Sequence, residues 1–238
     1  MTQPSSSNLS QAQACFAAPG SPVWKRTLDI GLIILAAPVL LPVMFLVWLV
    51  IKCVSPGPAL FRQERIGFLG RSFTCFKFRT MVINADTGIH QGHLRGLMCS
   101  NVPMKKLDVK GDPRLIPCAL VLRSLGLDEL PQIFNVLRGE MSLVGPRPCL
   151  PYEYENYTPR HRRRFEAVPG LTGLWQVSGK NRTTFEEMIN LDVYYARHRG
   201  FWLDLKILFK TLPSIVTQTR EVSAKPSAVL GNVPVSQR

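Results

Sequence analysis

The longest apolar segment of the chain is an uncharged run over residues 30–51. At about 1.5 Å per helical residue, a helix over this run is roughly 33 Å long, enough to cross the hydrocarbon core of a bilayer. Pro38 and Pro42 interrupt the run. Because each proline removes a backbone donor and clashes with the preceding turn, we expect a bend near the middle of the helix. The pattern predicts a kinked membrane helix over residues 25–54.

Basic residues flank this run on both sides. Lys25 and Arg26 precede it, and Lys52, Arg62 and Arg65 follow it. Flanks rich in Lys and Arg stay on the cytoplasmic side of a membrane. A re-entrant helix, which enters and leaves through one leaflet, places both flanks there, and it is the topology that we favour. A straight span and a buried helix of a soluble protein are the alternatives.

The segments around the apolar run are more polar. Residues 1–24 are rich in Ser, Gln, Ala and Pro, which predicts a disordered N-terminal tail. Two alternating segments, at residues 59–65 and 72–81, are joined through Gly67 and Gly70 and predict a β-hairpin. The hairpin would open a second domain.

Helical patterns dominate the rest of the chain. They cover residues 115–125, 129–138, 153–166, 184–198 and 201–212, while residues 140–151 predict a proline-rich loop. Thr184 and Glu187 have the spacing of a capping box. In the last helix, Trp202, Lys206 and Lys210 lie beside an apolar stripe, which suits an amphipathic helix in the headgroup zone.

The order of these elements predicts an α+β fold, mostly α, in one domain over residues 55–215. From residue 216 to residue 238 the composition is polar again and predicts a disordered C-terminal tail.

The net charge of +13 is spread along the chain. Such a charge suits nucleic acid, an anionic membrane surface or a polyanionic substrate. Because the chain has a membrane segment and no recognised nucleic-acid-binding module, we expect anionic membrane lipids and a polyanionic substrate, and no nucleic acid.

Two adjacent acids stand at the predicted start of the helix over residues 129–138. Asp128 and Glu129 have two interpretations. Acids in a first helical turn pair with free N–H groups and the macrodipole. Alternatively, an Asp carboxylate can attack phosphorus while its neighbour holds Mg²⁺ on phosphates. The pair alone favours the capping interpretation.

Several cations are candidates for binding phosphate. Lys77 and Arg79 lie about 7 Å apart on one face of a predicted strand, although exposed strand faces are often basic. Arg123 lies five residues before Asp128. Arg147 stands between two prolines, which restrict how it is presented and suit bidentate phosphate binding, but a plain surface turn has the same pattern.

The segment over residues 169–182 combines glycines with amide, aromatic and basic side chains that could seat a nucleotide. Its candidate ligands are Trp175, Gln176, Lys180, Asn181 and Arg182. It matches neither a phosphate-binding P-loop nor a dinucleotide fingerprint. Asp192 falls on an apolar helix face, where a carboxylate must be ion-paired or bind a metal, and the pattern leaves both alternatives open.

Read together, these segments resemble the bacterial sugar transferase family, the monotopic polyprenyl-phosphate phosphoglycosyl transferases. The likeness extends from about residue 25 to residue 214. It rests on the motifs at residues 76–81, 125–132, 139–148, 169–182, 191–195 and 203–206, whose order and spacing are more specific than any one of them.

The resemblance implies a reaction and its residues. Asp128 would attack the β-phosphorus of a UDP-sugar and release UMP, and polyprenyl (undecaprenyl) phosphate would then take the phosphosugar in a ping-pong scheme. Glu129 would bind Mg²⁺. Asp192 is a further metal candidate, from its position on an apolar helix face rather than from the resemblance. Lys77, Arg79, Arg123 and Arg147 would clamp phosphates.

The resemblance also implies a location. The family has a re-entrant helix broken at a Ser-Pro pair, to which Ala37-Pro38 corresponds here. The domain over residues 55–215 would then be catalytic and lie on the cytoplasmic face of the bacterial inner membrane, where downstream glycosyltransferases are conceivable partners in exopolysaccharide assembly.

One rival interpretation comes from another class of protein. A membrane-anchored adaptor would use the same basic surface to bind anionic lipid or a partner protein. For the adaptor, Asp128→Asn would leave function intact, whereas the enzyme would lose UMP release.

Overall fold

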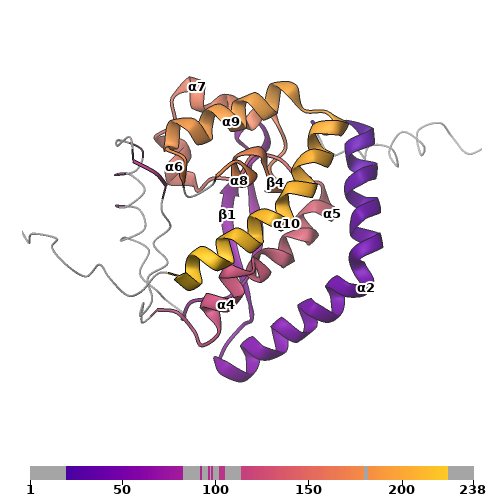
Figure 1. Ribbon diagram of the computed structural model, residues 1–238, viewed down its shortest axis with the longest axis vertical. Helices are drawn as coiled ribbons and strands as arrows, with labels where there is room; N and C mark the ends of the chain where they lie inside the picture. Colours follow the sequence, from indigo (N-terminus) through magenta and orange to yellow (C-terminus); the bar gives the residue numbers. More distant parts are fainter. Residues whose placement is uncertain are drawn as a thin grey trace, which may run out of the picture.

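The computed structural model describes residues 20–82, 114–179 and 182–224, together with a few positions between 92 and 104. It shows a mostly helical α+β architecture built around two small two-stranded sheets (Figure 1). The predicted N-terminal tail lies almost entirely outside the described residues, as does the last part of the predicted C-terminal tail.

The apolar run forms α2 (Val23–Val54), a helix long and apolar enough to cross a membrane. Pro38 and Pro42 lie inside it, and Figure 1 shows the helix sharply bent near its middle. Its central residues expose large apolar side chains, which include Ile34, Leu35, Val39, Leu41, Phe45 and Leu46. Exposed apolar surface of this extent marks a surface that contacts lipid or protein.

Each half of α2, in contrast, has one face buried against the rest of the protein. Ile33 packs in a cluster with Val136 and Met141, and Ile51 packs in another with Phe78. Both halves of the long helix therefore contribute to hydrophobic cores of the domain that follows it.

The predicted hairpin is confirmed. β1 (Leu60–Ile66) pairs antiparallel with β2 (Ser72–Phe78), with Leu60 opposite Phe78. A 3₁₀ turn, η1 (Phe68–Gly70), connects them, and Gly70 has φ +76°, a conformation that favours glycine. β2 packs against the segment that carries the two adjacent acids.

A second sheet lies where the sequence predicted only a loop. β3 (Ser142–Val144) pairs in parallel with β4 (Gly170–Thr172). The backbones touch so closely that a Cβ at Gly170 would lie 2.1 Å from the Gly145 nitrogen, and one at Gly145 would lie 2.3 Å from the Val168 oxygen. Glycine is therefore required on both sides of this contact.

The two predicted helices around the acids are shorter than expected. α4 covers Ala119–Ser124, and the segment predicted as one helix divides into the 3₁₀ helix η2 (Leu127–Gln132) and α5 (Ile133–Arg138). Pro131 lies inside η2 and lacks the N–H that an α-helical turn would use. The prediction of one α-helix from residue 129 is wrong for this reason.

The predicted helix over residues 153–166 is also divided. It forms α6 (Pro151–Glu155), α7 (Pro159–Arg162) and the 3₁₀ helix η3 (Arg163–Glu166). Thr158 has an extended conformation with ψ 162°, as expected before a proline, and its side chain accepts a hydrogen bond from the His161 N–H.

The C-terminal helices follow the prediction more closely. After α8 (Leu174–Val177), α9 (Phe185–His198) begins with the predicted capping box of Thr184 and Glu187. α10 (Phe201–Ala224) continues beyond residue 216, where the composition had suggested disorder. α10 packs against α8, β3 and β4 and exposes Trp202, Phe209 and Leu212.

Candidate active site

Two cations and one carboxylate form the centre of the site. Glu129 Oε1 accepts hydrogen bonds from Lys77 Nζ at 3.2 Å and from Arg147 Nη2 at 3.1 Å. The side chain of Glu129 is 24% exposed, that of Lys77 16% and that of Arg147 28%. They are therefore shielded enough for strong electrostatic interactions while solvent still reaches them.

Each of the three residues comes from a different element. Lys77 lies near the end of β2, Glu129 lies in η2, and Arg147 follows β3. Asn135 of α5 fixes β2 from the other side, since its side chain accepts from the Phe76 N–H at 3.1 Å and donates to the Thr74 carbonyl at 2.7 Å. The position of Lys77 thus depends on α5.

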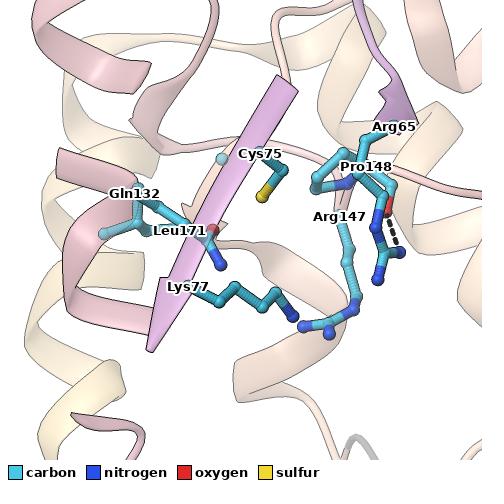
Figure 2. Close-up of a pocket in the computed structure, with 8 residues that line it drawn as sticks. Arg65, Cys75, Lys77, Gln132, Arg147, Pro148 and Leu171 are labelled. Carbon is cyan, nitrogen blue, oxygen red and sulfur yellow. Dashed lines mark hydrogen bonds between the residues drawn. The ribbon is translucent and has the colours of Figure 1, made fainter. Parts of the chain in front are cut away.

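A cavity opens beside these side chains (Figure 2). It is lined by Arg65, Cys75, Lys77, Gln132, Arg147, Pro148, Gly170 and Leu171. Figure 2 shows the charged ends of Lys77 and Arg147 pointing toward each other. The cavity is small, about 10 Å³, but the three cations around it form a positively charged surface that is suited to an anion with several charges, such as a diphosphate.

The charges at the site perturb one another. Burial lowers the pKa of Lys77, while the neighbouring Glu129 carboxylate opposes that shift. Glu129 holds the pKa of Arg147 above its usual range. Burial and the nearby Arg147 lower the pKa of Arg65. An anionic ligand would relieve the repulsion among these cations.

Asp128 lies beside Glu129 in the first turn of η2. Its charge favours the protonated form of Lys77 and raises the pKa of that lysine, although less than Glu129 does. The residue that caps η2 is Gly126, with φ +69° and no side-chain hydrogen bond. Glu129 accepts hydrogen bonds from Lys77 and Arg147, contacts that the capping interpretation does not require.

Arg65 is a site residue whose place in the sequence indicated only a charge flanking the apolar run. It is buried, lines the cavity, and donates to the Pro148 carbonyl at 3.1 Å. Basic residues are common on short strands, so the position of Arg65 in the sequence did not indicate a role in the site. Only the pairing of β1 with β2 brings it to the cavity.

Two predicted phosphate ligands have other contacts. Arg79 is buried and donates to the carbonyls of Ser55 and Pro56 at 3.0 and 2.6 Å, just beyond the end of α2. Arg123 donates from Nε to Thr80 Oγ1 at 3.0 Å. The structure thus gives Arg79 a different environment from Lys77, although both were expected on one strand face.

Of the candidate nucleotide ligands in residues 169–182, the three that the structure describes do not line the cavity. Trp175 is buried in a hydrophobic cluster and donates to Thr183 Oγ1 at 2.6 Å. Gln176 is buried and donates to the Leu171 carbonyl at 3.1 Å. Arg182 is exposed. Lys180 and Asn181 lie outside the described residues.

Asp192 forms an ion pair rather than a carboxylate cluster. Its Oδ2 lies 2.5 Å from Arg164 Nη2, and both side chains are 2% exposed. Within the residues that the structure describes, no three His, Cys, Asp or Glu side chains gather as a metal site. Of the two alternatives for Asp192, the structure favours the structural ion pair.

Comparison with known proteins places this chain in a family. The model of the bacterial sugar transferase family matches residues 20–218. The exopolysaccharide production protein ExoY of Sinorhizobium fredii is 38% identical over 191 residues, which are 80% of this chain and 84% of ExoY.

Two other relatives have more specific names. The UDP-glucose:undecaprenyl-phosphate glucose-1-phosphate transferase of Caulobacter vibrioides is 39% identical over 81% of this chain and 70% of its own length. The undecaprenyl-phosphate galactose phosphotransferase of Salmonella typhimurium is 38% identical over 79% of this chain, but the match spans only 39% of that longer protein. The chain belongs to the bacterial sugar transferase family, as its motifs predicted.

Proposed function

We propose that this protein transfers a sugar-1-phosphate from a UDP-sugar to undecaprenyl phosphate and releases UMP, as the first membrane step of exopolysaccharide assembly. The observation that carries the proposal is the cluster of Lys77, Glu129 and Arg147 beside Asp128, in a chain of this family. The names of the relatives support both substrates. Two of those names specify glucose and galactose, so a UDP-hexose is the donor that we favour.

The reaction proceeds in two displacements at one phosphorus. A carboxylate oxygen of Asp128 attacks the β-phosphorus of the donor, the bond from that phosphorus to the bridging oxygen breaks, and UMP leaves with the electron pair. An oxygen of undecaprenyl phosphate then attacks the same phosphorus and displaces the Asp128 carboxylate. Lys77 and Arg147 hold the phosphate oxygens and offset the charge that develops on them.

The acids of η2 fit a magnesium ion. Mg²⁺ in proteins is usually held by one or two carboxylates together with substrate phosphates, so a cluster of three acids is unnecessary. Glu129, with Asp128 next to it, supplies such oxygens at the cation-lined cavity. When bound, the ion neutralises charge on the donor's diphosphate. Asp192, which pairs with Arg164, is not part of this proposal. EDTA is expected to abolish UMP release and excess Mg²⁺ to restore it.

We also propose that α2 is re-entrant, because both of its ends are attached to the same domain. Near its start, Lys25 forms a buried ion pair with Asp204 of α10, and Arg26 donates to the Val136 and Leu137 carbonyls of α5. Beyond its end, Arg79 donates to the Ser55 and Pro56 carbonyls. A straight span would separate these two ends by a bilayer.

The re-entrant topology places the cavity where a soluble UDP-sugar and a lipid phosphate meet, on the cytoplasmic face of the inner membrane. It predicts that tags at the two ends of the chain are digested from the same side of sealed inner-membrane vesicles. If the protease digests one tag from outside the vesicles while the other tag is protected inside them, α2 spans the membrane and this topology is wrong.

UMP release tests the enzymatic proposal. Detergent-solubilised protein is supplied with Mg²⁺, undecaprenyl phosphate and a panel of UDP-sugars. Asp128→Asn should lower the rate by about 10³-fold or more, since loss of a nucleophile costs at least that much in other enzymes. Glu155→Gln changes an exposed acid of α6 and serves as the matched control. No UMP release by the wild type with any donor would favour the adaptor, and equal rates for Asp128→Asn and wild type would show that Asp128 is not the nucleophile.

A further inference from the structure

The loop that carries Arg147 is held by its carbonyl groups. Pro146 and Pro148 flank Arg147 and have no N–H to donate. The Arg147 carbonyl accepts a hydrogen bond from Arg164 Nη2 at 2.9 Å, and the Pro148 carbonyl accepts one from Arg65 Nη1 at 3.1 Å. Two buried guanidinium groups thus support two successive peptide units at the phosphate-binding arginine.

These two guanidinium groups differ in their electrostatic effect. Arg65 lines the cavity and adds positive charge there. Arg164 pairs at 2.5 Å with Asp192, and both side chains are 2% exposed, while its Nη1 donates to the Tyr157 hydroxyl at 3.0 Å. Because Asp192 balances its charge, Arg164 acts on the site through the position of the loop.

We propose that Arg164, with Asp192 as its counter-ion, is a positioning residue for donor binding. It fixes the backbone at Arg147 so that the Arg147 guanidinium stays against Glu129 and reaches a phosphate of the donor. A chain of contacts then runs from α9 (Asp192) through η3 (Arg164) to the loop after β3 and on to η2. The inference rests on the proposed function, which gives Arg147 its role.

A double-mutant cycle separates this role from simple support of the fold. The first arm replaces the buried pair by apolar residues, Arg164→Met with Asp192→Leu, an exchange that in other proteins often preserves stability. The second arm is Arg147→Ala. The four proteins of the cycle are compared for kcat/KM of UMP release and for UDP-sugar binding by calorimetry.

Positioning predicts strong non-additivity. Replacing the pair should lower kcat/KM by about 10- to 100-fold, since a small displacement of a binding group has costs of this order. In the Arg147→Ala background the same replacement should have no further effect, because no guanidinium is left to position. Arg164→Lys, which keeps a cationic donor beside Asp192, should recover part of the loss and tests the inference if the apolar pair does not fold.

The matched control is the other buried ion pair, Lys25 with Asp204. Lys25→Met with Asp204→Leu should have the same effect with or without Arg147, because this pair joins α2 to α10 and contacts neither Arg147 nor its flanking prolines. It reaches the end of β3 through the Tyr195 hydroxyl, which donates to the Val144 carbonyl. Equal losses from the Arg164 and Asp192 replacement in both Arg147 backgrounds would overturn the inference. An Arg147→Ala variant with wild-type activity and binding would also overturn the inference. The proposed function would still hold in that case, provided that the wild type releases UMP. Binding that follows the predicted cycle without any UMP release would instead contradict the proposed function alone.

Discussion

The charge of Lys77 is expected to make donor binding sensitive to alkaline pH. Burial and two cationic neighbours, Arg147 and Arg65, lower the pKa of Lys77, and the Glu129 carboxylate offsets only part of the shift. Lys77 therefore loses its proton at a lower pH than an ordinary lysine does. The protonated form, which binds phosphate, predominates below this lowered pKa and is lost as the pH rises through it.

The size of the effect follows from the contact that is lost. A hydrogen bond to a charged group contributes about 1.5–3 kcal/mol, so deprotonation of Lys77 should reduce kcat/KM by roughly 10- to 150-fold. The assay measures UMP release at subsaturating UDP-sugar from neutral to alkaline pH, because kcat/KM reports the groups of the free enzyme.

Lys77→Arg is the comparison that isolates the lysine. Arginine stays charged throughout this range, so the variant should lose the alkaline decline even if its activity at neutral pH is lower. Titration of the donor, the acceptor or the detergent would be common to both proteins. An identical alkaline decline in wild type and Lys77→Arg would refute the assignment of Lys77 to phosphate binding.

Two further predictions concern the elements that hold the site. Asn135→Ala should lower the free energy of unfolding by about 1–3 kcal/mol, because it leaves the buried Phe76 N–H of β2 without its acceptor and removes the donor to the Thr74 carbonyl. An unshifted midpoint in urea titration of the detergent-solubilised protein would show that this reasoning is wrong. Gly170→Ala places a Cβ 2.1 Å from the Gly145 nitrogen, so β3 and β4 must separate. We expect a lower thermal midpoint and at least about tenfold weaker UDP-sugar binding, and a variant with wild-type values in both measurements would show that the contact is not needed.

Local patterns in the sequence predicted the elements whose cause is local. The hairpin followed from alternation on both sides of Gly67 and Gly70, and the start of α9 followed from the capping box of Thr184 and Glu187. The bend of α2 followed from its prolines. In each case the decisive residues lie within a few positions of one another.

The predictions that failed depended on contacts between distant segments. β3 has three residues, too few for a recognisable alternation, and it exists because β4 pairs with it. The sequence also gave no sign that Arg79 would turn to the carbonyls just beyond α2. Pro131 was expected to be harmless in an α-helical first turn, but the segment around it is a 3₁₀ helix.

The residues of the candidate site also fall into two groups: those that local motifs indicated and those that depend on contacts between distant segments. The motifs indicated Lys77, Glu129 and Arg147 individually, and the structure brings these three together. Arg65 reaches the cavity only through strand pairing. Asp192 left two alternatives open in the sequence, because its partner Arg164 lies 28 residues away in the chain, on an element that packs against α9.

The central claim is that the Asp128 side chain carries the phosphosugar between the two substrates. Intact-protein and peptide mass spectrometry of wild-type material that is active in UMP release tests it most directly, with UDP-sugar and Mg²⁺ present and undecaprenyl phosphate absent. The account predicts a mass increase equal to one phosphosugar, located on Asp128 and discharged when undecaprenyl phosphate is added. Active protein with no adduct at Asp128 would contradict the account and favour direct transfer between the two substrates.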